Sequence, residues 1–238
     1  MLHASVLSMR DDAAIWGLPG WLAGVLFLLP FAGAVGVVAS FAHRPLFRFL
    51  TEEDSLLEWS QFAGYTLAAV LSALCWRVLS RAGNHRWALA YLLLAVGCLF
   101  VAGEEISWGQ RIFGWGTPEA LEKVNKQDET TIHNVGRLQE IFNFVLLCGG
   151  LYGVVASWLA ARRVRPWRDL PWLAVPPLCL TGAFVVLAGY RALRFAIFVE
   201  PRYSVVKFGE WPEFCFAGAL AVFTFLVWRR LRASPRAG

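Results

Sequence analysis

The chain has 238 residues, of which 58% are hydrophobic and 16% are charged, and its formal net charge is +5. Soluble domains carry about 25% charged residues, so this composition excludes an ordinary soluble domain. The apolar residues come in long blocks, which indicates an integral membrane protein, because each spanning helix needs roughly 20 mostly apolar residues.

Six apolar blocks predict an all-α fold, in which residues 1–238 form a single transmembrane helix bundle. The predicted spans are 15–41, 59–76, 87–103, 138–161, 170–199 and 211–228. The first block begins too late and runs too long for a cleaved signal peptide, so we expect it to be retained. Between the third and fourth spans, Thr117 and Pro118 have the order of a helix cap and first position. They predict a short amphipathic helix on the outer membrane surface.

Basic residues are distributed unevenly between the two sides of this bundle. The N-terminus, the loops 77–86 and 162–169 and the C-terminal tail hold twelve of the 22 Lys and Arg residues but only three of the 17 acids. Short loops dense in Arg lie in the cytoplasm, which predicts a bacterial inner-membrane protein with both termini cytoplasmic. The runs "ARRVRPWR" and "WRRLRASPR" are then topology signals that also attract anionic lipid, and no nucleic-acid partner is expected.

The first polar cluster, residues 51–65, opens the second span. Ser55 and Glu58 have the spacing of a capping box, so ordinary helix-start chemistry is one explanation. A functional interpretation stays open beside it, because Glu58, Gln61 and Tyr65 share one helical face that carries polar atoms into the apolar region. Glu58 is therefore a candidate catalytic residue, and Gln61 and Tyr65 are candidate substrate or ion-pair residues.

The stretch "GEEISWGQR", residues 103–111, ends the third span with two adjacent acids. Glu104 and Glu105 repel each other at a helix C-terminus, where the helix dipole also disfavours negative charge. A helix end that reaches water is the alternative interpretation. The pattern favours a catalytic site, in which Gln110 and Arg111 extend the polar surface and a positive partner compensates the two acids.

A third cluster lies at residues 125–136, where Glu129 and His133 are one helical turn apart. Together with Glu105 they are candidate ligands of a divalent metal ion, namely Zn, Mn or Fe. His133 is also a candidate catalytic acid or base. The spacing matches neither H-E-x-x-H nor the Glu-x-x-His motif of di-iron bundles, and a solvated loop histidine is the alternative.

The fifth span contains two arginines, Arg191 and Arg194. If the proline pair at 176–177 breaks the helix and the spanning part begins after it, both lie within the membrane. An arginine there costs roughly 2.5–3.5 kcal/mol and usually finds a partner. We then predict that one of them points into the bundle and pairs with Glu104 or Glu105. If the span begins at residue 170, both arginines only mark the interface.

Three stretches within residues 50–145, "EDSLLEWSQF", "GEEISWGQRIFGWGTPE" and "ETTIHN", resemble uncharacterised multi-pass bacterial membrane proteins that carry a GEEISWGQR-type stretch. The resemblance implies no activity, cofactor or ligand. It favours treating the candidate catalytic residues as one constellation. These residues are Glu58, Glu104, Glu105, Gln110, Arg111 and His133.

Two classes of function follow from these patterns. The first is a membrane enzyme with an outward-facing site of carboxylates, His133 and arginine, which uses a metal ion or acid–base chemistry on a lipid or lipid-linked substrate. The second is a non-enzymatic small transporter or membrane-complex subunit, whose polar cluster is a structural ion-pair network. The oligomeric state does not follow from the sequence.

Overall fold

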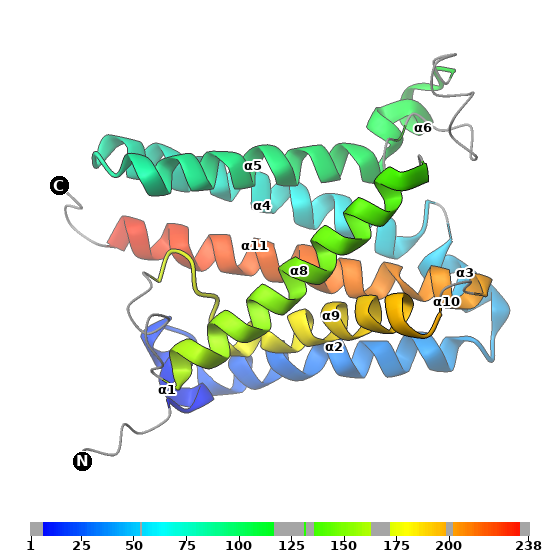
Figure 1. The fold of residues 1–238 in the computed structure, drawn as a ribbon, viewed down its shortest axis with the longest axis horizontal. Coiled ribbons are helices and arrows are strands. Elements are labelled where there is room, and N and C mark those ends of the chain that lie inside the picture. Colours follow the sequence, from blue (N-terminus) through cyan, green and yellow to red (C-terminus); the bar gives the residue numbers. More distant parts are fainter. Residues whose placement is uncertain are drawn as a thin grey trace.

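The computed structural model describes residues 7–52, 54–116, 131, 136–162, 172–198 and 202–233. Every regular element in these ranges is a helix (Figure 1). The α-helices are α1 (Met9–Ile15), α2 (Gly20–Ser40), α3 (Arg44–Thr51), α4 (Leu56–Arg81), α5 (His85–Glu105), α6 (Gln110–Phe113), α8 (Gly136–Ala161), α9 (Thr181–Ala196), α10 (Tyr203–Phe208) and α11 (Glu210–Ala233). Two short 3₁₀ helices are η1 (Ser107–Gly109) and η3 (Leu178–Leu180).

Among the described residues, six helical stretches are long and apolar enough to cross a membrane, which confirms the predicted bundle of about six spans. The first residues of two spans differ from the predicted ones, and in each case the local backbone explains the difference. α2 begins at Gly20 rather than at residue 15, because Gly17 adopts a left-handed conformation (φ 63°) between α1 and α2. The fifth span begins at Leu178, directly after the proline pair, since prolines have no backbone N–H to donate. The amphipathic helix predicted from residue 117 lies outside the described residues.

Small residues determine how closely the helices approach one another. α4 packs against α5 and α11, and α9 packs against α8, α11 and α2. A Cβ atom at Gly64 of α4 would lie 3.1 Å from Ala217 of α11. A Cβ atom at Gly182 of α9 would lie 2.1 Å from the carbonyl oxygen of Phe27 in α2. Close backbone approach at small residues is typical of membrane helices, which lack a hydrophobic driving force for association within lipid.

Large apolar side chains cover the outer faces of several spans. On α5, Leu89, Leu93, Val96 and Leu99 are each more than half exposed. An exposed apolar surface of this kind marks contact with a partner or a membrane. Because it follows helices of spanning length, we interpret it as the surface that faces the lipid tails.

The two ends of the bundle differ in charge. α1 and the C-terminal end of α11 lie at one end, whereas α3, α6 and α10 lie at the other (Figure 1). We call the first the arginine end, after the arginines of α4, α11 and the residue that follows α8: Arg77, Arg81, Arg162, Arg229, Arg230 and Arg232. We call the second the acidic end, after acids at the ends of α4, α5 and α11: Glu58, Glu104, Glu105, Glu210 and Glu213.

At the arginine end, Asp12 of α1 caps the helical segment that follows the proline pair. Its Oδ2 accepts a hydrogen bond of 2.7 Å from the Leu178 N–H. A carboxylate is favourable at this position because the first N–H groups of a helix have no partner within the helix. Burial raises the pKa of Asp12 above its ordinary value of 3.8, while the hydrogen bond from Leu178 acts in the opposite direction.

Replacing Asp12 with alanine is expected to destabilise the protein by about 0.5–2 kcal/mol, the usual cost of losing a helix cap. Asp12→Asn keeps an acceptor and is expected to cost less. Unfolding of the detergent-solubilised proteins, followed by circular dichroism, measures both effects. Equal stability of the alanine and asparagine variants would contradict the capping role.

The raised pKa of Asp12 also predicts that the stability of the folded protein depends on pH. Because the folded state binds a proton at Asp12 more tightly than the unfolded state, protonation favours folding. The stabilisation of the folded state by protonation of Asp12 is therefore fully present below pH 3.8, and it declines as the pH rises through the raised pKa. We expect this decline in the wild type and not in Asp12→Asn, measured as unfolding midpoints across that window.

Candidate functional site

Carboxylates from three helices meet at the acidic end. Glu58 lies in the first turn of α4, Glu104 and Glu105 end α5, and Glu210 and Glu213 lie in the first turn of α11. Glu105 is within electrostatic range of the other four. We call these five residues the acidic cluster. They converge because α4 packs against both α5 and α11.

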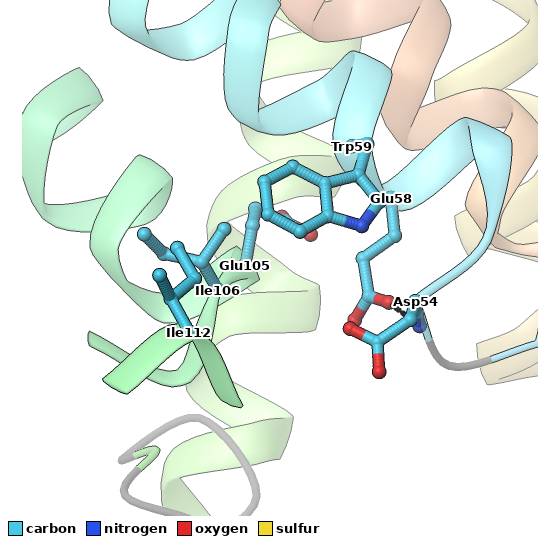
Figure 2. A pocket seen from close by; sticks show the side chains of 6 residues that line it. All are labelled: Asp54, Glu58, Trp59, Glu105, Ile106 and Ile112. Atoms are coloured by element: carbon cyan, nitrogen blue, oxygen red, sulfur yellow. Dashed lines mark hydrogen bonds between the residues drawn. The ribbon is translucent and has the colours of Figure 1, made fainter. Parts of the chain in front are cut away.

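A small pocket opens beside this cluster (Figure 2). It is lined by Asp54, Glu58, Trp59, Glu105, Ile106 and Ile112. Glu58 and Glu105 reach it from different helices, α4 and α5. Trp59 and Ile112 are 42% and 52% exposed, so the pocket combines carboxylates with an accessible apolar surface. The structure thus brings together two of the predicted catalytic residues, Glu58 and Glu105, in one pocket.

The start of α4 holds Glu58 in place. The Ser55 hydroxyl, as N-cap, accepts a hydrogen bond of 3.4 Å from the Glu58 N–H. The Glu58 carboxylate accepts a hydrogen bond of 2.5 Å from the Asp54 N–H (Figure 2). The Ser55 half of the predicted capping box is therefore present, whereas the Glu58 carboxylate accepts from the Asp54 N–H instead of the Ser55 N–H. The cap does not exclude a functional role, because the same carboxylate lines the pocket.

The stretch "GEEISWGQR" contains a strained turn directly after α5. Ser107, Trp108 and Gly109 have φ values of 48°, 54° and 84°, three left-handed residues in succession. Left-handed backbone is unfavourable for residues other than glycine, and it concentrates at functional sites, where surrounding structure maintains it. The helix therefore does not continue past Glu105, and the turn carries Ile112 back toward the pocket.

Trp108 separates the environments of the two adjacent glutamates. Its Nε1 donates a hydrogen bond of 2.6 Å to Glu104 Oε1, and Glu104 is only 4% exposed. The Trp108 ring covers Gly103, where a Cβ atom would lie 2.9 Å from the ring, so the turn requires glycine there. Glu104 is thus bound within the turn, whereas Glu105 faces the pocket.

Arg191 lies inside the bundle, as predicted for one of the two arginines, and it is 5% exposed. Its Nη2 forms an ion pair with Glu213 of α11, and its Nη1 donates a hydrogen bond of 2.6 Å to Asn143 Oδ1 of α8. The ion pair is with Glu213 rather than with Glu104 or Glu105. The physical reason is the packing, since α9 lies against α11 and α8, while α5 lies against α4.

Arg194, one turn further along α9, is half-buried. Within the described part of the chain, its Nε and Nη1 atoms are buried and make no hydrogen bond. The prediction that Arg191 or Arg194 pairs with Glu104 or Glu105 is therefore wrong about the partner, which is Glu213, although Arg191 does point into the bundle as predicted.

Gln61 connects α4 to the acidic cluster. It is fully buried, and its Nε2 donates to both the backbone oxygen and the carboxylate of Glu210, at 3.2 and 2.9 Å. Its Oε1 has no hydrogen-bond partner among the described residues. Tyr65, also buried, lies within electrostatic range of Glu105, Glu213 and Arg191. The polar face predicted on α4 therefore does meet the other charged residues.

Three polar residues of this region are absent from the sequence-based site: Asn143, Glu210 and Glu213. Glu210 and Glu213 open the last span much as Glu58 opens the second, and this shared position is the signal that points to them. Asn143 is a lone amide in the apolar run "IFNFVLL", a placement typical of a buried hydrogen-bonding group in a membrane helix.

The remaining predicted residues are placed only in part. Gln110 is half-buried at the start of α6, whereas the Arg111 side chain, Glu129 and His133 lie outside the described residues. In the ranges that the structure describes, no three His, Cys, Asp or Glu side chains come close enough to hold a metal ion together. The metal site of Glu105, Glu129 and His133 therefore stays a prediction.

Comparisons with known proteins were made at the levels of family, sequence and structure. The chain matches no family model, no curated protein and no solved structure. The interpretation of the acidic end therefore depends on its own chemistry.

Proposed function

We propose that the protein resides in a bacterial inner membrane, with the arginine end in the cytoplasm and the acidic end outward. The support is the excess of arginine over acid in the short loops and tails of one end, the pattern that orients membrane proteins. Both termini are then cytoplasmic, and the pocket of Glu58 and Glu105 is near the outer membrane surface.

We further propose that this pocket is the acid–base site of a membrane enzyme. The observation that carries the proposal is that Glu58 and Glu105, from different helices, line one pocket. Glu58 accepts a backbone N–H, which suits the role of an ionised base. Glu105 lines the same pocket from α5, and acid–base catalysis needs a second group that donates a proton. Glu105 is therefore assigned the role of the acid.

The apolar surface of the pocket suggests the class of substrate. Trp59 and Ile112 are exposed beside the two carboxylates, and tryptophan favours the level of the lipid headgroups. The pocket has a volume of about 10 Å³, room for about one water molecule, so a lipid or lipid-linked molecule would present its polar group at the mouth of the pocket while its chain remains in the bilayer. No co-substrate other than water is needed for hydrolysis at such a site.

Incubation of the purified protein with a lipid extract of bacterial inner membranes tests this function. Mass spectrometry should detect at least one lipid that the wild type converts. In Glu105→Gln and Glu58→Gln the rate is expected to fall by about 10²–10⁴-fold, the typical contribution of one general acid or base. Glu140→Gln, which removes an exposed carboxylate of α8, is the matched control and should convert the lipid normally.

The outcomes separate the two function classes. If the wild type and both pocket variants leave every lipid unchanged, the enzyme proposal is wrong. The structural ion-pair network is then favoured, and the observation that supports it is the Arg191 contact with both Glu213 and Asn143, which ties three helices together.

A divalent metal ion at Glu105, Glu129 and His133 remains a separate proposal. When bound, Zn, Mn or Fe would activate a water molecule as the nucleophile. Elemental analysis of the same purified proteins tests it: stoichiometric metal in the wild type should be lost in His133→Ala and retained in Glu140→Gln. Absence of metal from gently purified wild type would contradict it.

A further inference from the structure

We propose that a groove between α4 and α11 at the arginine end binds the phosphate headgroup of an anionic membrane lipid. The groove has a volume of about 290 Å³, close to the lower limit of roughly 300 Å³ for small-molecule sites. It is lined by Leu74, Arg77, Val78, Arg81, Trp228 and Arg232. It lies at the opposite end of α4 from Glu58, so it is independent of the acid–base site.

Three arginines line this groove and have no acidic partner among the described residues. Arg77 and Arg81 are one turn apart on α4, and Arg232 comes from the last turn of α11. All three are exposed, and none forms a hydrogen bond or ion pair with another described residue. Three like charges around one hollow repel each other, and a bound anion removes that repulsion.

Two neighbouring arginines of α11 behave differently, which makes the groove distinctive. Arg229 donates to the backbone oxygen of Trp16. Arg230 lies over the rings of Trp16 and Trp172, at 5.6 and 4.6 Å from their centroids. Both of these arginines have partners elsewhere in the described bundle, whereas Arg77 and Arg81 have none among the described residues and Arg232 has only the ring of Trp228, which itself lines the groove. The attraction of cations to a helix C-terminus applies to both sets and therefore does not explain the difference.

The apolar wall of the groove favours a lipid over a free anion. Leu74 and Val78 lie on the same side of α4 as the two arginines, and Leu74 is one turn deeper in the span than Arg77, so an acyl chain could follow this apolar side. Trp228 adds an aromatic surface, 5.2 Å from the Arg232 guanidinium. Arginine binds phosphate through two parallel hydrogen bonds, and basic pockets between membrane helices on the cytoplasmic side bind anionic headgroups.

Native mass spectrometry of the full chain, titrated with phosphatidylglycerol, cardiolipin or phosphatidylcholine, tests the proposal. Changing Arg77, Arg81 and Arg232 together to glutamine should weaken binding of the two anionic lipids roughly tenfold to hundredfold. The control changes three arginines of the same end outside the groove, Arg10, Arg86 and Arg162, and should bind as the wild type does. If the triple variant fails to fold, the milder variant Arg81→Gln replaces it in the titration. This single change should weaken binding of the anionic lipids several-fold.

Each of three other outcomes would overturn the proposal. Equal losses in the two triple variants indicate diffuse surface attraction without a site. Binding of phosphatidylcholine as tight as that of the two anionic lipids shows that the groove does not recognise the charge of the headgroup. Displacement of the lipid by millimolar inorganic phosphate assigns the groove to a free anion instead.

Discussion

Replacing Arg191 with methionine is expected to destabilise the folded protein by about 3–5 kcal/mol, the usual cost of breaking a buried ion pair from one side. The variant leaves Glu213 without its cation inside the acidic cluster, and it leaves Asn143 Oδ1 without its donor. Glu213→Gln should cost less, because a neutral amide oxygen can still accept from Arg191. Denaturant or thermal unfolding in detergent micelles, followed by circular dichroism, measures these differences.

The double variant Arg191→Met with Glu213→Leu gives the sharper test. Removing both charges leaves neither member of the pair without its partner, so the combined loss should be smaller than the sum of the losses in Arg191→Met alone and Glu213→Leu alone. Arg194→Met is the matched control, because Arg194 is on the same helix and its Nε and Nη1 have no hydrogen-bond partner among the described residues. A cost for Arg191→Met no larger than that for Arg194→Met would show that the ion pair does not stabilise the bundle.

Gly182→Ala should produce the second large effect, a loss of stability of about 1–3 kcal/mol or more. The added Cβ atom would lie 2.1 Å from the carbonyl oxygen of Phe27 and 3.1 Å from the ring of Phe31. A side chain can rotate away from such a clash, but a backbone oxygen of α2 cannot. α9 and α2 must therefore move apart, and the packing between them is lost along several turns.

Gly189→Ala is the control for this change, because it makes the same substitution on the same helix where nothing lies within 4 Å of the new atom. It should be neutral or stabilising by about 0.5–1 kcal/mol, since alanine favours the helix. The unfolding midpoint of Gly182→Ala should fall, whereas that of Gly189→Ala should stay unchanged or rise. If both variants are as stable as the wild type, α2 and α9 do not approach at Gly182.

Local features of the site were predictable from the sequence. The Ser55 cap and the polar face of Gln61 and Tyr65 depend on neighbours within one or two turns. The proline pair indicated the start of the fifth span as one of two alternatives, and the structure selects it over the predicted start at residue 170. Arg191 was predictable for a related reason, because a charge in the middle of an apolar helix requires a partner inside the bundle. Periodicity and helix chemistry are sufficient for all of these predictions.

The identity of the partners was not predictable, because it depends on which helices pack together. Arg191 meets Glu213 since α9 lies beside α11, and no local pattern encodes that adjacency. The turn at Ser107 and Trp108 is a second example. Neither residue type signals a positive φ, and the turn is maintained by the Trp108 ring over Gly103 and its bond to Glu104.

The position of α11 between α4 and α9 has a consequence for biosynthesis. Helices enter the bilayer in chain order as the ribosome proceeds, so α4, α5, α8 and α9 are present before α11 is made. Until then, Gln61 lacks the acceptor on Glu210, and Arg191 lacks its counter-ion on Glu213. Arg191 therefore gains its ion-pair partner only when α11 is inserted. The polar region of the acidic end is completed only when α11 joins α4 and α9.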